Sequence, residues 1–399
     1  MLREATVVVL FYLIFKMSTF ITLFNQIVAT LGTFVIISWM SWILGCYLYK
    51  HFIVNYFERV DPCRKAILIT GCGTGLAHGF VAKLINYGFI VIATSSNPNS
   101  ESFQELIERI NHDDKLIVIK LDVTNDENVD TCYQQVDEYL KKTNTHLFGI
   151  INNAGIGPSA PFEWACVNSH GIRTFDVNVL GMVRVTKKFL PLMRSSYCKS
   201  NDLKYECGMV TPCRIVNIAS FLGHDGIPQL SYYCASKAAM ISMTKSLKRE
   251  LNMFGIKVIS IEPNFFKSKI TSFETIKQCM LNSWNNAGEI TQETYGKHFL
   301  RNILNFDHFY LNKVPSTQHE LCYHDVLSAM TVNDPEHTYQ VCPIVPKIYL
   351  YFYYTFFPLH VQHYIWNIAT EYVIPKLFSQ YRGYKNFDSD TQLRQGTRN

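Results

Sequence analysis

Short apolar runs alternate with amphipathic segments through the middle of this chain. The runs are 65–70, 89–94, 115–121, 147–152, 213–219 and 257–262. Segments with a helical spacing of apolar residues lie between them, among them 102–110, 128–142, 171–195 and 231–254. Strands that are apolar along their whole length belong to parallel sheets covered by helices on both faces. The pattern predicts an α/β fold with a doubly wound, Rossmann-like parallel sheet over residues 64–264.

The alternation ends after Pro263. Residues 265–332 show helical and irregular patterns, and residues 344–378 are apolar, rich in Tyr, Phe and His, and interrupted by Pro358. This last segment either lies at a membrane interface or packs on the core and lines a lipophilic pocket. We divide the chain into an anchor region (1–60), a central domain (61–332, with its two parts at 64–264 and 265–332) and an aromatic-rich C-terminal tail (333–399).

The N-terminal region has the composition of a membrane anchor. From Met17 to Tyr49 there is no Asp, Glu, Lys or Arg. Residues 27–49 are long enough, as a helix, to cross about 30 Å of hydrocarbon. A shorter apolar run at 5–15 allows either a single span or a hairpin. The basic residues that follow the span favour a cytosolic central domain.

Charge and cysteine content narrow the function classes. The formal net charge is only +5 and the Lys and Arg residues form no cluster, so we expect no nucleic-acid partner. The 12 cysteines include no CxxC pair, and no His pair has zinc-ligand spacing, so we expect no metal. Several cysteines lie inside predicted strands or helices, which favours buried thiols in a reducing compartment.

A glycine-rich turn follows the first predicted strand and begins a helix. In ITGCGTGLAHG, the absence of side chains at the glycines lets a backbone approach a pyrophosphate, which then meets the N–H groups of the helix N-terminus. An ordinary tight turn between strand and helix remains the alternative. The candidate cofactor-binding residues here are Thr70, Gly71, Gly73, Thr74, Gly75 and Leu76.

Polar residues also follow the next three strands. The second strand ends at Thr94 and Ser95, where NAD enzymes usually carry an acidic residue and NADP enzymes need a cation. Hydroxyl groups can still bind a ribose diol but cannot neutralise a phosphate, so we favour NAD over NADP. The further candidates are Asp122, as an acceptor for the adenine amino group, and Val123, Asn153, Ala154 and Gly155.

A candidate acid–base pair lies in SYYCASKAA (231–239). Residues four apart share a helix face, so Tyr233 can act with Lys237, whereas the neighbouring Tyr232 points elsewhere. A phenol has an ordinary pKa near 10, and we expect the Lys237 ammonium to lower it. Ser220 can hydrogen-bond a substrate oxygen, and Asn178, inside a predicted helix, can hold a water that relays protons to Lys237. Together these residues predict hydride transfer with a nicotinamide cofactor.

The motifs TGCGTGLA, LDVT, NNAG and YCASK, with Asn178 and Ser220, resemble the short-chain dehydrogenase/reductase family. Longer stretches, such as FDVNVLGMVRVTKKFLPLMR, resemble its retinol dehydrogenase and 17β-hydroxysteroid dehydrogenase branch, which also contains the 3-hydroxybutyrate dehydrogenases. The resemblance implies the catalytic residues Asn178, Ser220, Tyr233 and Lys237 and a central catalytic domain. It also implies cofactor contacts from Pro263 and from Ser268, which stands where the family has a carboxamide-binding threonine.

Besides Ser268, three departures from the family are visible. Ala77 replaces the third turn glycine, and Asn264 replaces the glycine after Pro263, where Asn tolerates a left-handed backbone. An extra stretch, 196–212, is expected to form a surface loop.

The expected function is oxidation or reduction of a lipophilic alcohol or carbonyl, a steroid or retinoid. The substrate pocket should come from about 264–332 and the aromatic tail. The resemblance implies attachment to the endoplasmic reticulum, with a mitochondrial membrane second, and long helices that can form a homodimer. Two alternatives remain: a small hydroxy-acid dehydrogenase, with Lys267 or Lys269 binding the carboxylate, and a non-catalytic binding protein.

Overall fold

The computed structural model describes residues 2–49, 59–110, 114–202 and 212–342. Contacts divide the chain into two units, residues 1–59 with 332–334, and residues 60–331 with 335–399. The predictions for residues 343–399, and for residues 203–211 of the extra stretch, lie outside the described part of the chain.

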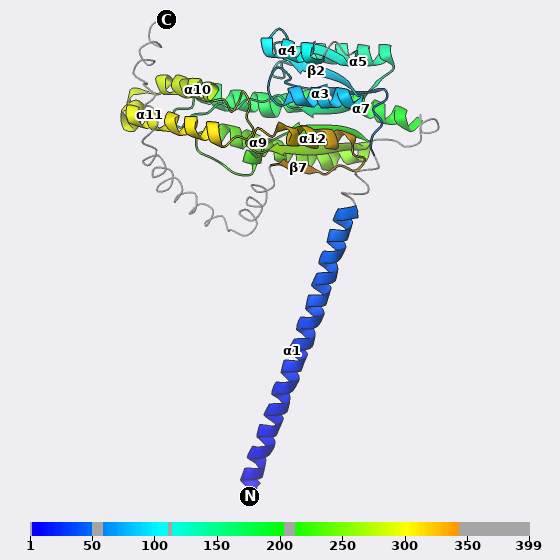
Figure 1. Cartoon of the computed structure of the whole chain (residues 1–399), viewed down its shortest axis with the longest axis vertical. Coiled ribbons are helices and arrows are strands. Elements are labelled where there is room, and N and C mark those ends of the chain that lie inside the picture. Colours follow the sequence, from blue (N-terminus) through cyan, green and yellow to red (C-terminus); the bar gives the residue numbers. More distant parts are fainter. Residues whose placement is uncertain (1, 50–58, 111–113, 203–211, 343–399) are drawn as a thin grey trace. The chain divides into compact units, whose positions relative to one another are not determined.

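A seven-stranded parallel sheet forms the centre of the second unit (Figure 1). Its order is β3-β2-β1-β4-β5-β6-β7, so the chain adds strands on one side of β1 and then, from β4 onward, on the other side, as in a doubly wound sheet. The strands are β1 (Lys65–Ile69), β2 (Ile90–Ser95), β3 (Leu116–Lys120), β4 (His146–Asn152), β5 (Cys213–Ile218), β6 (Ile256–Pro263) and β7 (Thr338–Val341). The predicted α/β fold is confirmed, and six of its strands are those expected from the apolar runs.

Strand β7 was not predicted. It pairs with β6 from Ser260↔Thr338 to Pro263↔Val341, inside the segment that the sequence analysis assigned to the tail. The sheet therefore extends past residue 332. Only Val341 of this strand is buried, which is typical of an edge strand. The strand has four residues, too few to give a clear sequence pattern.

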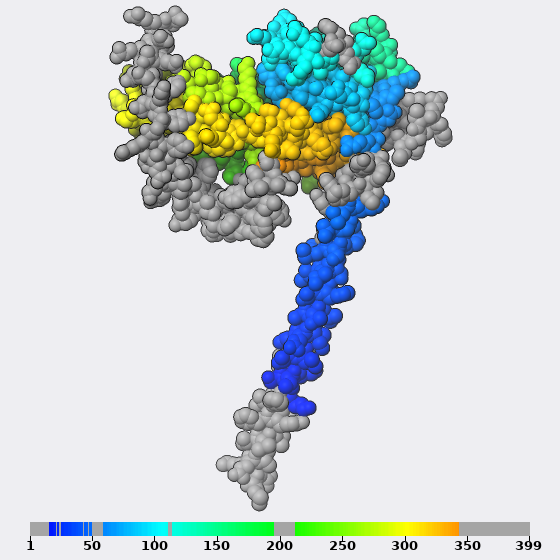
Figure 2. Space-filling view, in the orientation of Figure 1, coloured from blue at the N-terminus to red at the C-terminus, as the bar shows by residue number. Residues whose placement is uncertain are grey.

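The helices around the sheet are α3 (Ala77–Tyr87), α4 (Glu101–Ile110), α5 (Asp126–Thr143), α6 (Arg173–Phe175), α7 (Gly181–Asp202), α9 (Ser231–Leu251), α10 (Phe273–Asn286), α11 (Glu289–Lys313) and α12 (His319–Thr331). Helices cover both faces of the sheet, and α10 and α11 pack together in a separate cluster beside it. One core cluster joins α3, α4 and α12 to the sheet, and a second joins α5, α7 and α9 to the opposite face. In Figure 2, α11 and α12 form a continuous yellow-to-orange band on the surface of this unit.

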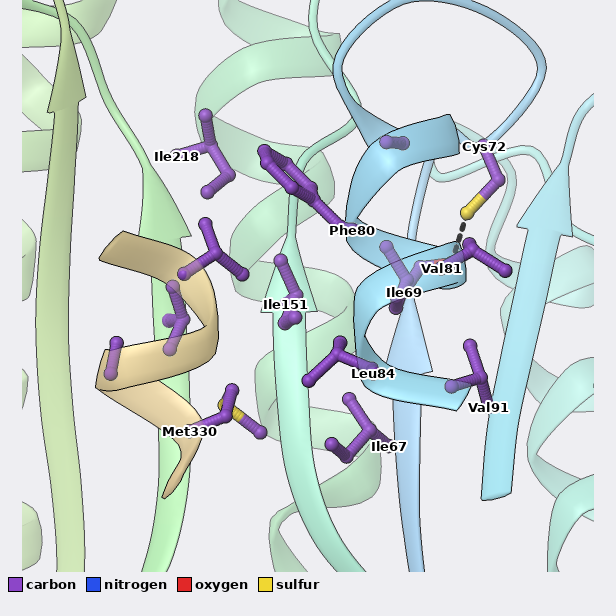
Figure 3. Close-up of a cluster of buried hydrophobic side chains, with 14 of the residues drawn as sticks. Ile67, Ile69, Cys72, Phe80, Val81, Leu84, Val91, Ile151, Ile218 and Met330 are labelled. Carbon is purple, nitrogen blue, oxygen red and sulfur yellow. Dashed lines mark hydrogen bonds between the residues drawn. The ribbon is translucent and has the colours of Figure 1, made fainter. Parts of the chain in front are cut away.

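Alternate strand residues supply the two core clusters. Ile67 and Ile69 of β1 face α3, whereas Ala66 and Leu68 face the other layer. Figure 3 shows the first cluster, with Phe80 of α3 directed at the strands. Phe80 is fully buried, which contributes about 1.5–3 kcal/mol. The sheet is thereby held rigid, and the loops at its carboxyl edge are positioned for a site.

The extra stretch differs from expectation at its start. Helix α7 continues to Asp202, so residues 196–202 are helical and not a surface loop. Before it, residues 167–180 contain two π-helical turns, Val167–Ile172 (η2) and Asp176–Leu180 (η3), on either side of α6. Such turns leave some backbone groups outside the regular hydrogen-bond ladder and are frequent at functional sites.

The first unit is dominated by one long helix. Helix α1 runs continuously from Leu2 to Leu48, so the hairpin alternative is not what the structure shows. Within it, Lys16–Cys46 is long and apolar enough to cross a membrane, by length and composition alone. Helix α1 is a candidate membrane anchor.

Candidate active site

The glycine-rich turn between β1 and α3 forms a backbone cradle. Gly71 has φ 70°, and a Cβ there would lie 2.6 Å from Ala154 Cα, so only glycine fits. Gly75 also has positive φ, 81°, and a Cβ at Gly73 would lie 2.8 Å from Ser95 Oγ. Space is open at the Gly75 Cβ position, whereas the Cβ positions of Gly71 and Gly73 are blocked by Ala154 and Ser95. These features fit a dinucleotide.

Asn153 and Thr70 hold this turn against β4. Asn153 Nδ2 donates to the carbonyls of Thr70 and Gly71, both at 3.0 Å. Thr70 Oγ1 accepts from the backbone N–H groups of Asn153 and Ala154, also at 3.0 Å. Thr70 is buried, and it does not line the cavity described below. Its contribution to cofactor binding is therefore to shape the turn.

The end of β2 corrects one sequence prediction. The Thr94 hydroxyl donates to the Ile69 carbonyl at 3.0 Å, and Thr94 is fully buried, so it cannot bind a ribose. Ser95 lines the cavity, together with Ser96, Asn97 and Ser100, which the sequence analysis did not single out. The run SSNPNS (95–100) could have indicated them, because polar residues continue past the end of the strand.

Asp122 and Val123 follow β3 at the same edge of the sheet. Asp122 Oδ1 accepts from the backbone N–H of Thr124 at 2.9 Å and from its hydroxyl at 2.7 Å. The carboxylate is thus oriented by its own turn, and both residues line the cavity.

One cavity of about 910 Å³ brings these segments together with the chemical residues. Of the predicted cofactor-binding residues it is lined by Gly71, Gly73, Thr74, Gly75, Leu76, Ser95, Asp122, Val123, Asn153, Ala154, Gly155, Tyr233, Lys237, Pro263 and Ser268. Ser220 also lines it, whereas Asn178 lies behind its wall. Side chains from seven segments far apart in sequence therefore meet at one site.

Lys237 lies behind Tyr233 on α9. Its ammonium donates to the Ile218 carbonyl at 2.8 Å and lies 5.7 Å from the centroid of the Tyr233 ring. Both residues are on the face of α9 that turns toward the cavity, because they are one helical turn apart.

The pKa of Tyr233 differs from the sequence expectation. Burial raises the pKa of the phenol to about 12, and a hydrogen bond with Ser220 only partly opposes this. Burial also lowers the pKa of Lys237 to about 8. The expected lowering of the phenol pKa is therefore not seen in this structure, because desolvation disfavours the charged phenolate more than Ser220 favours it.

Ser220 is held at the end of β5 by the turn that follows it. Its Oγ accepts from the backbone N–H of Leu222 at 3.2 Å and donates to the Pro263 carbonyl at 3.4 Å. Its hydroxyl lies near enough to the Tyr233 phenol to oppose the rise in the pKa of that phenol. Two hydroxyl groups thus converge on one point in the cavity, which is the arrangement needed to bind one substrate oxygen.

Asn178 uses its side chain to hold the loop after β4. Its Oδ1 accepts from the Ile156 N–H at 2.8 Å, and its Nδ2 donates to the Ile156 carbonyl at 2.9 Å and to Ser236 Oγ at 2.9 Å. Asn178 is fully buried in the π-helical turn η3. The side chain is thereby fully engaged in holding the loop, so the expected water contact from it is not available in this structure.

The segment after β6 completes the wall. Asn264 is not among the described residues with positive φ, so the left-handed turn expected at this position does not form. Instead its Oδ1 accepts from the Phe265 N–H at 2.9 Å. The backbone N–H of Ser268 donates to Thr271 Oγ1 at 2.8 Å, which orders the turn that carries the Ser268 hydroxyl.

Several residues that line the cavity belong to none of the sequence motifs. Helical and loop residues on the substrate side include Ile156, Asn168, Ile172, Arg173, Leu222, Leu230, Phe265, Phe266, Lys269, Ile270 and Ile276. Most are ordinary apolar residues, and only packing brings them to the cavity.

Comparison with known proteins identifies the family to which this chain belongs. The family model for short chain dehydrogenases matches residues 65–278. Retinol dehydrogenase 16 of Rattus norvegicus is 33% identical over 246 residues, covering 60% of this chain and 69% of that protein. The mitochondrial D-beta-hydroxybutyrate dehydrogenase of Rattus norvegicus is 30% identical over 250 residues, covering 61% of this chain and 68% of that protein.

Solved structures share the fold. A short-chain dehydrogenase/reductase from Burkholderia phymatum in complex with NAD has a TM-score of 0.51 and 20% identity, and covers 71% of this chain and 91% of that one. One from Burkholderia cenocepacia in complex with NADP has a TM-score of 0.50 and 18% identity, with coverage of 72% and 92%. The matched family region contains the glycine-rich cradle, Ser220, Tyr233 and Lys237. The chain therefore belongs to the short-chain dehydrogenase family and is an oxidoreductase of that type.

Proposed function

We propose that this protein is a membrane-anchored, NAD-dependent oxidoreductase that interconverts a lipophilic alcohol and its carbonyl compound. Retinoids and steroids are the substrate classes. The observation that carries the proposal is that Ser220, Tyr233 and Lys237 line the same cavity as the Gly71–Gly75 cradle.

Each residue has a distinct role in this reaction. A bound nicotinamide ring supplies the carbon that accepts or gives the hydride. Ser220 hydrogen-bonds the substrate oxygen, and Tyr233 exchanges its proton. With its high pKa, Tyr233 is protonated at neutral pH and is ready to donate when a carbonyl is reduced. Oxidation needs the phenolate, which a protonated Lys237 favours.

The cavity end near β2 supports NAD over NADP. Residues 95–100 contribute Ser95, Ser96, Asn97 and Ser100 to the wall and no cation. The charged nitrogens of the wall come from Arg173, Lys237 and Lys269. A 2′-phosphate near residues 95–100 would have hydroxyl and amide partners alone, which leaves its charge unbalanced.

The other end of the cavity supports a lipophilic substrate. Its wall includes Ile172, Leu230, Phe265, Ile270 and Ile276. Burial of apolar substrate surface against such a wall contributes roughly 25 cal/mol per Å². Retinoids and steroids have a large apolar surface that can be buried against this wall.

A small hydroxy acid is the second candidate. Lys269 lines the cavity, whereas Lys267 does not, so Lys269 is the cation that could bind a carboxylate. One of the relatives is a D-beta-hydroxybutyrate dehydrogenase. We rank this candidate second because the wall is mainly apolar.

The proposed location is the endoplasmic reticulum membrane, with α1 as a single-pass anchor. The support is the apolar stretch Lys16–Cys46, and retinol dehydrogenases are among the relatives. A homodimer formed through α7 and α9 is proposed from the family resemblance alone.

The decisive experiment uses full-length protein purified in detergent. Retinols, hydroxysteroids and 3-hydroxybutyrate are offered with NAD or NADP, and reduced nicotinamide absorbance is followed. We expect turnover of a retinol or steroid with NAD that Tyr233→Phe abolishes. Turnover of hydroxybutyrate that Lys269→Met abolishes would establish the second candidate instead. Absence of any Tyr233-dependent turnover would refute the proposed function.

A further inference from the structure

Two segments that line the apolar end of the cavity, η2 and α10, are joined through the side chain of His170. The turn η2 contributes Asn168 and Ile172 to the cavity, and α10 contributes Ile276. His170 lies on η2 between the two lining residues and is only 8% exposed. Its Nε2 lies 3.0 Å from Ser283 Oγ and 3.4 Å from Cys279 Sγ, both on α10.

The hydrogen-bond network indicates which ring nitrogen carries the proton. The Ser283 hydroxyl donates to the Cys279 carbonyl at 2.9 Å, so its oxygen accepts from His170 Nε2–H. On the other side of the ring, Nδ1 lies 3.0 Å from Ser169 Oγ, whose hydroxyl can donate to it. Burial lowers the pKa of His170, which keeps the ring neutral. A neutral imidazole with its proton on Nε2 satisfies both Ser283 and Ser169.

A catalytic role for this cluster does not fit its chemistry. Burial raises the pKa of Cys279, so it is not an activated thiolate.

Helix α10 is also held by apolar packing, with the rings of Trp284 and Trp164 at a centroid distance of 4.8 Å. Apolar contacts of this kind tolerate small shifts, whereas a buried hydrogen bond specifies one arrangement.

We propose that His170 is a positioning residue for substrate binding. Through its hydrogen bond to Ser283 it holds α10 against η2, and so sets the separation between the Asn168 and Ile172 wall and Ile276. The inference deepens the proposed function, because it concerns the side of the cavity that receives the lipophilic substrate.

The position of His170 predicts a selective defect. The glycine-rich cradle is built by β1, β2 and the loop after β4, none of which contacts His170 through the bonds described above. Without the His170–Ser283 bond, α10 loses its fixed position and the substrate wall loosens. Substrate affinity should fall while cofactor affinity and the chemical step remain.

The test compares three variants of the full-length protein in detergent. His170→Phe keeps a planar ring without a donor, His170→Gln restores an N–H near the place of Nε2, and Ser283→Ala removes the acceptor. Hydrogen exchange of peptides from 273–286 is measured by mass spectrometry, and KM and kcat are measured with the substrate found in the screen.

We expect His170→Phe to accelerate exchange in α10 and to raise the substrate KM about tenfold, equivalent to ~1.4 kcal/mol. The KM for NAD and kcat should change less than about twofold, far below that tenfold step. His170→Gln should restore most of the protection. The His170→Phe, Ser283→Ala double variant should be no worse than the stronger single variant.

Unchanged exchange in both His170→Phe and Ser283→Ala would overturn the inference, and so would equal losses in the Phe and Gln variants. Hydrogen exchange needs no turnover. Faster α10 exchange in a protein that oxidises no lipophilic alcohol would therefore refute the proposed function and support the His170 contact.

Discussion

Tyr233 and Lys237 lie one turn apart on α9, with the Lys237 ammonium 5.7 Å from the centre of the Tyr233 ring. The adjacent Tyr232 has different surroundings. Its ring packs against Phe162, with ring centroids 5.7 Å apart, and beside Gly171. Consecutive helix residues differ by about 100° in direction, so only one of two neighbouring tyrosines can face the cavity.

Replacement of Tyr233 by Phe should remove turnover and leave cofactor binding intact. The phenol is the group proposed to exchange the proton, and such a group contributes roughly 10²–10⁴ in rate. Steady-state kcat and NADH binding by fluorescence are the measurements. Tyr232→Phe is the matched control and should keep most activity. Equal losses from the two variants would contradict the assignment of Tyr233.

Replacement of Gly71 by Ala should prevent cofactor binding or folding of the cradle. A Cβ would lie 2.6 Å from Ala154 Cα, and φ is 70°. NADH titration and thermal unfolding test this. Gly226→Ala is the control, because no atom lies within 4 Å of its Cβ position and no positive φ is recorded there. Normal NADH affinity in Gly71→Ala would show that the turn does not carry the cofactor.

The buried carboxyl group of Asp307 should make the free energy of unfolding fall as the pH rises. Burial raises the pKa of this α11 carboxyl to about 7, and its Oδ2 has no hydrogen-bond partner among the described residues. The folded state retains a proton that the unfolded chain releases above its ordinary pKa of 3.8. Folding is therefore penalised progressively from about pH 4 to about pH 7, by roughly 4 kcal/mol at most.

Asp307→Asn should remove this dependence and stabilise the protein at pH 8 more than at pH 5. Thermal unfolding at the two pH values measures it, with the exposed Glu108→Gln as control. A stability difference between Asp307→Asn and the parent protein that is the same at both pH values would rule out the raised pKa.

Cofactor choice should respond to a single cation near the end of β2. Ser96→Arg places a guanidinium where the wall has hydroxyl and amide groups. We expect the KM for NADP to fall about tenfold relative to that for NAD, equivalent to ~1.4 kcal/mol. Ser96→Gln, long but uncharged, should leave the ratio near its starting value. Parent protein that already prefers NADP would contradict the proposed use of NAD.

The architecture could be read from the sequence because its signals are local. Apolar runs, helical spacing and the glycine-rich turn each depend on neighbouring residues, and they predicted six strands and the position of the cradle. Tyr233 was separated from Tyr232 by helix geometry alone. The prediction for Thr94 was wrong because local signals show only that a hydroxyl group lies at a strand end. They do not show that this hydroxyl donates to the Ile69 carbonyl on the neighbouring strand.

By itself, the sequence determined the order of the elements and predicted which groups do the chemistry. Only the tertiary structure decided which of them face the cavity, how far burial shifts the pKa of Tyr233 and Lys237, and that His170 bonds Ser283, 113 residues away. The physical reason is that backbone periodicity is set by adjacent residues. Desolvation and hydrogen-bond partnership depend instead on groups that only folding brings together.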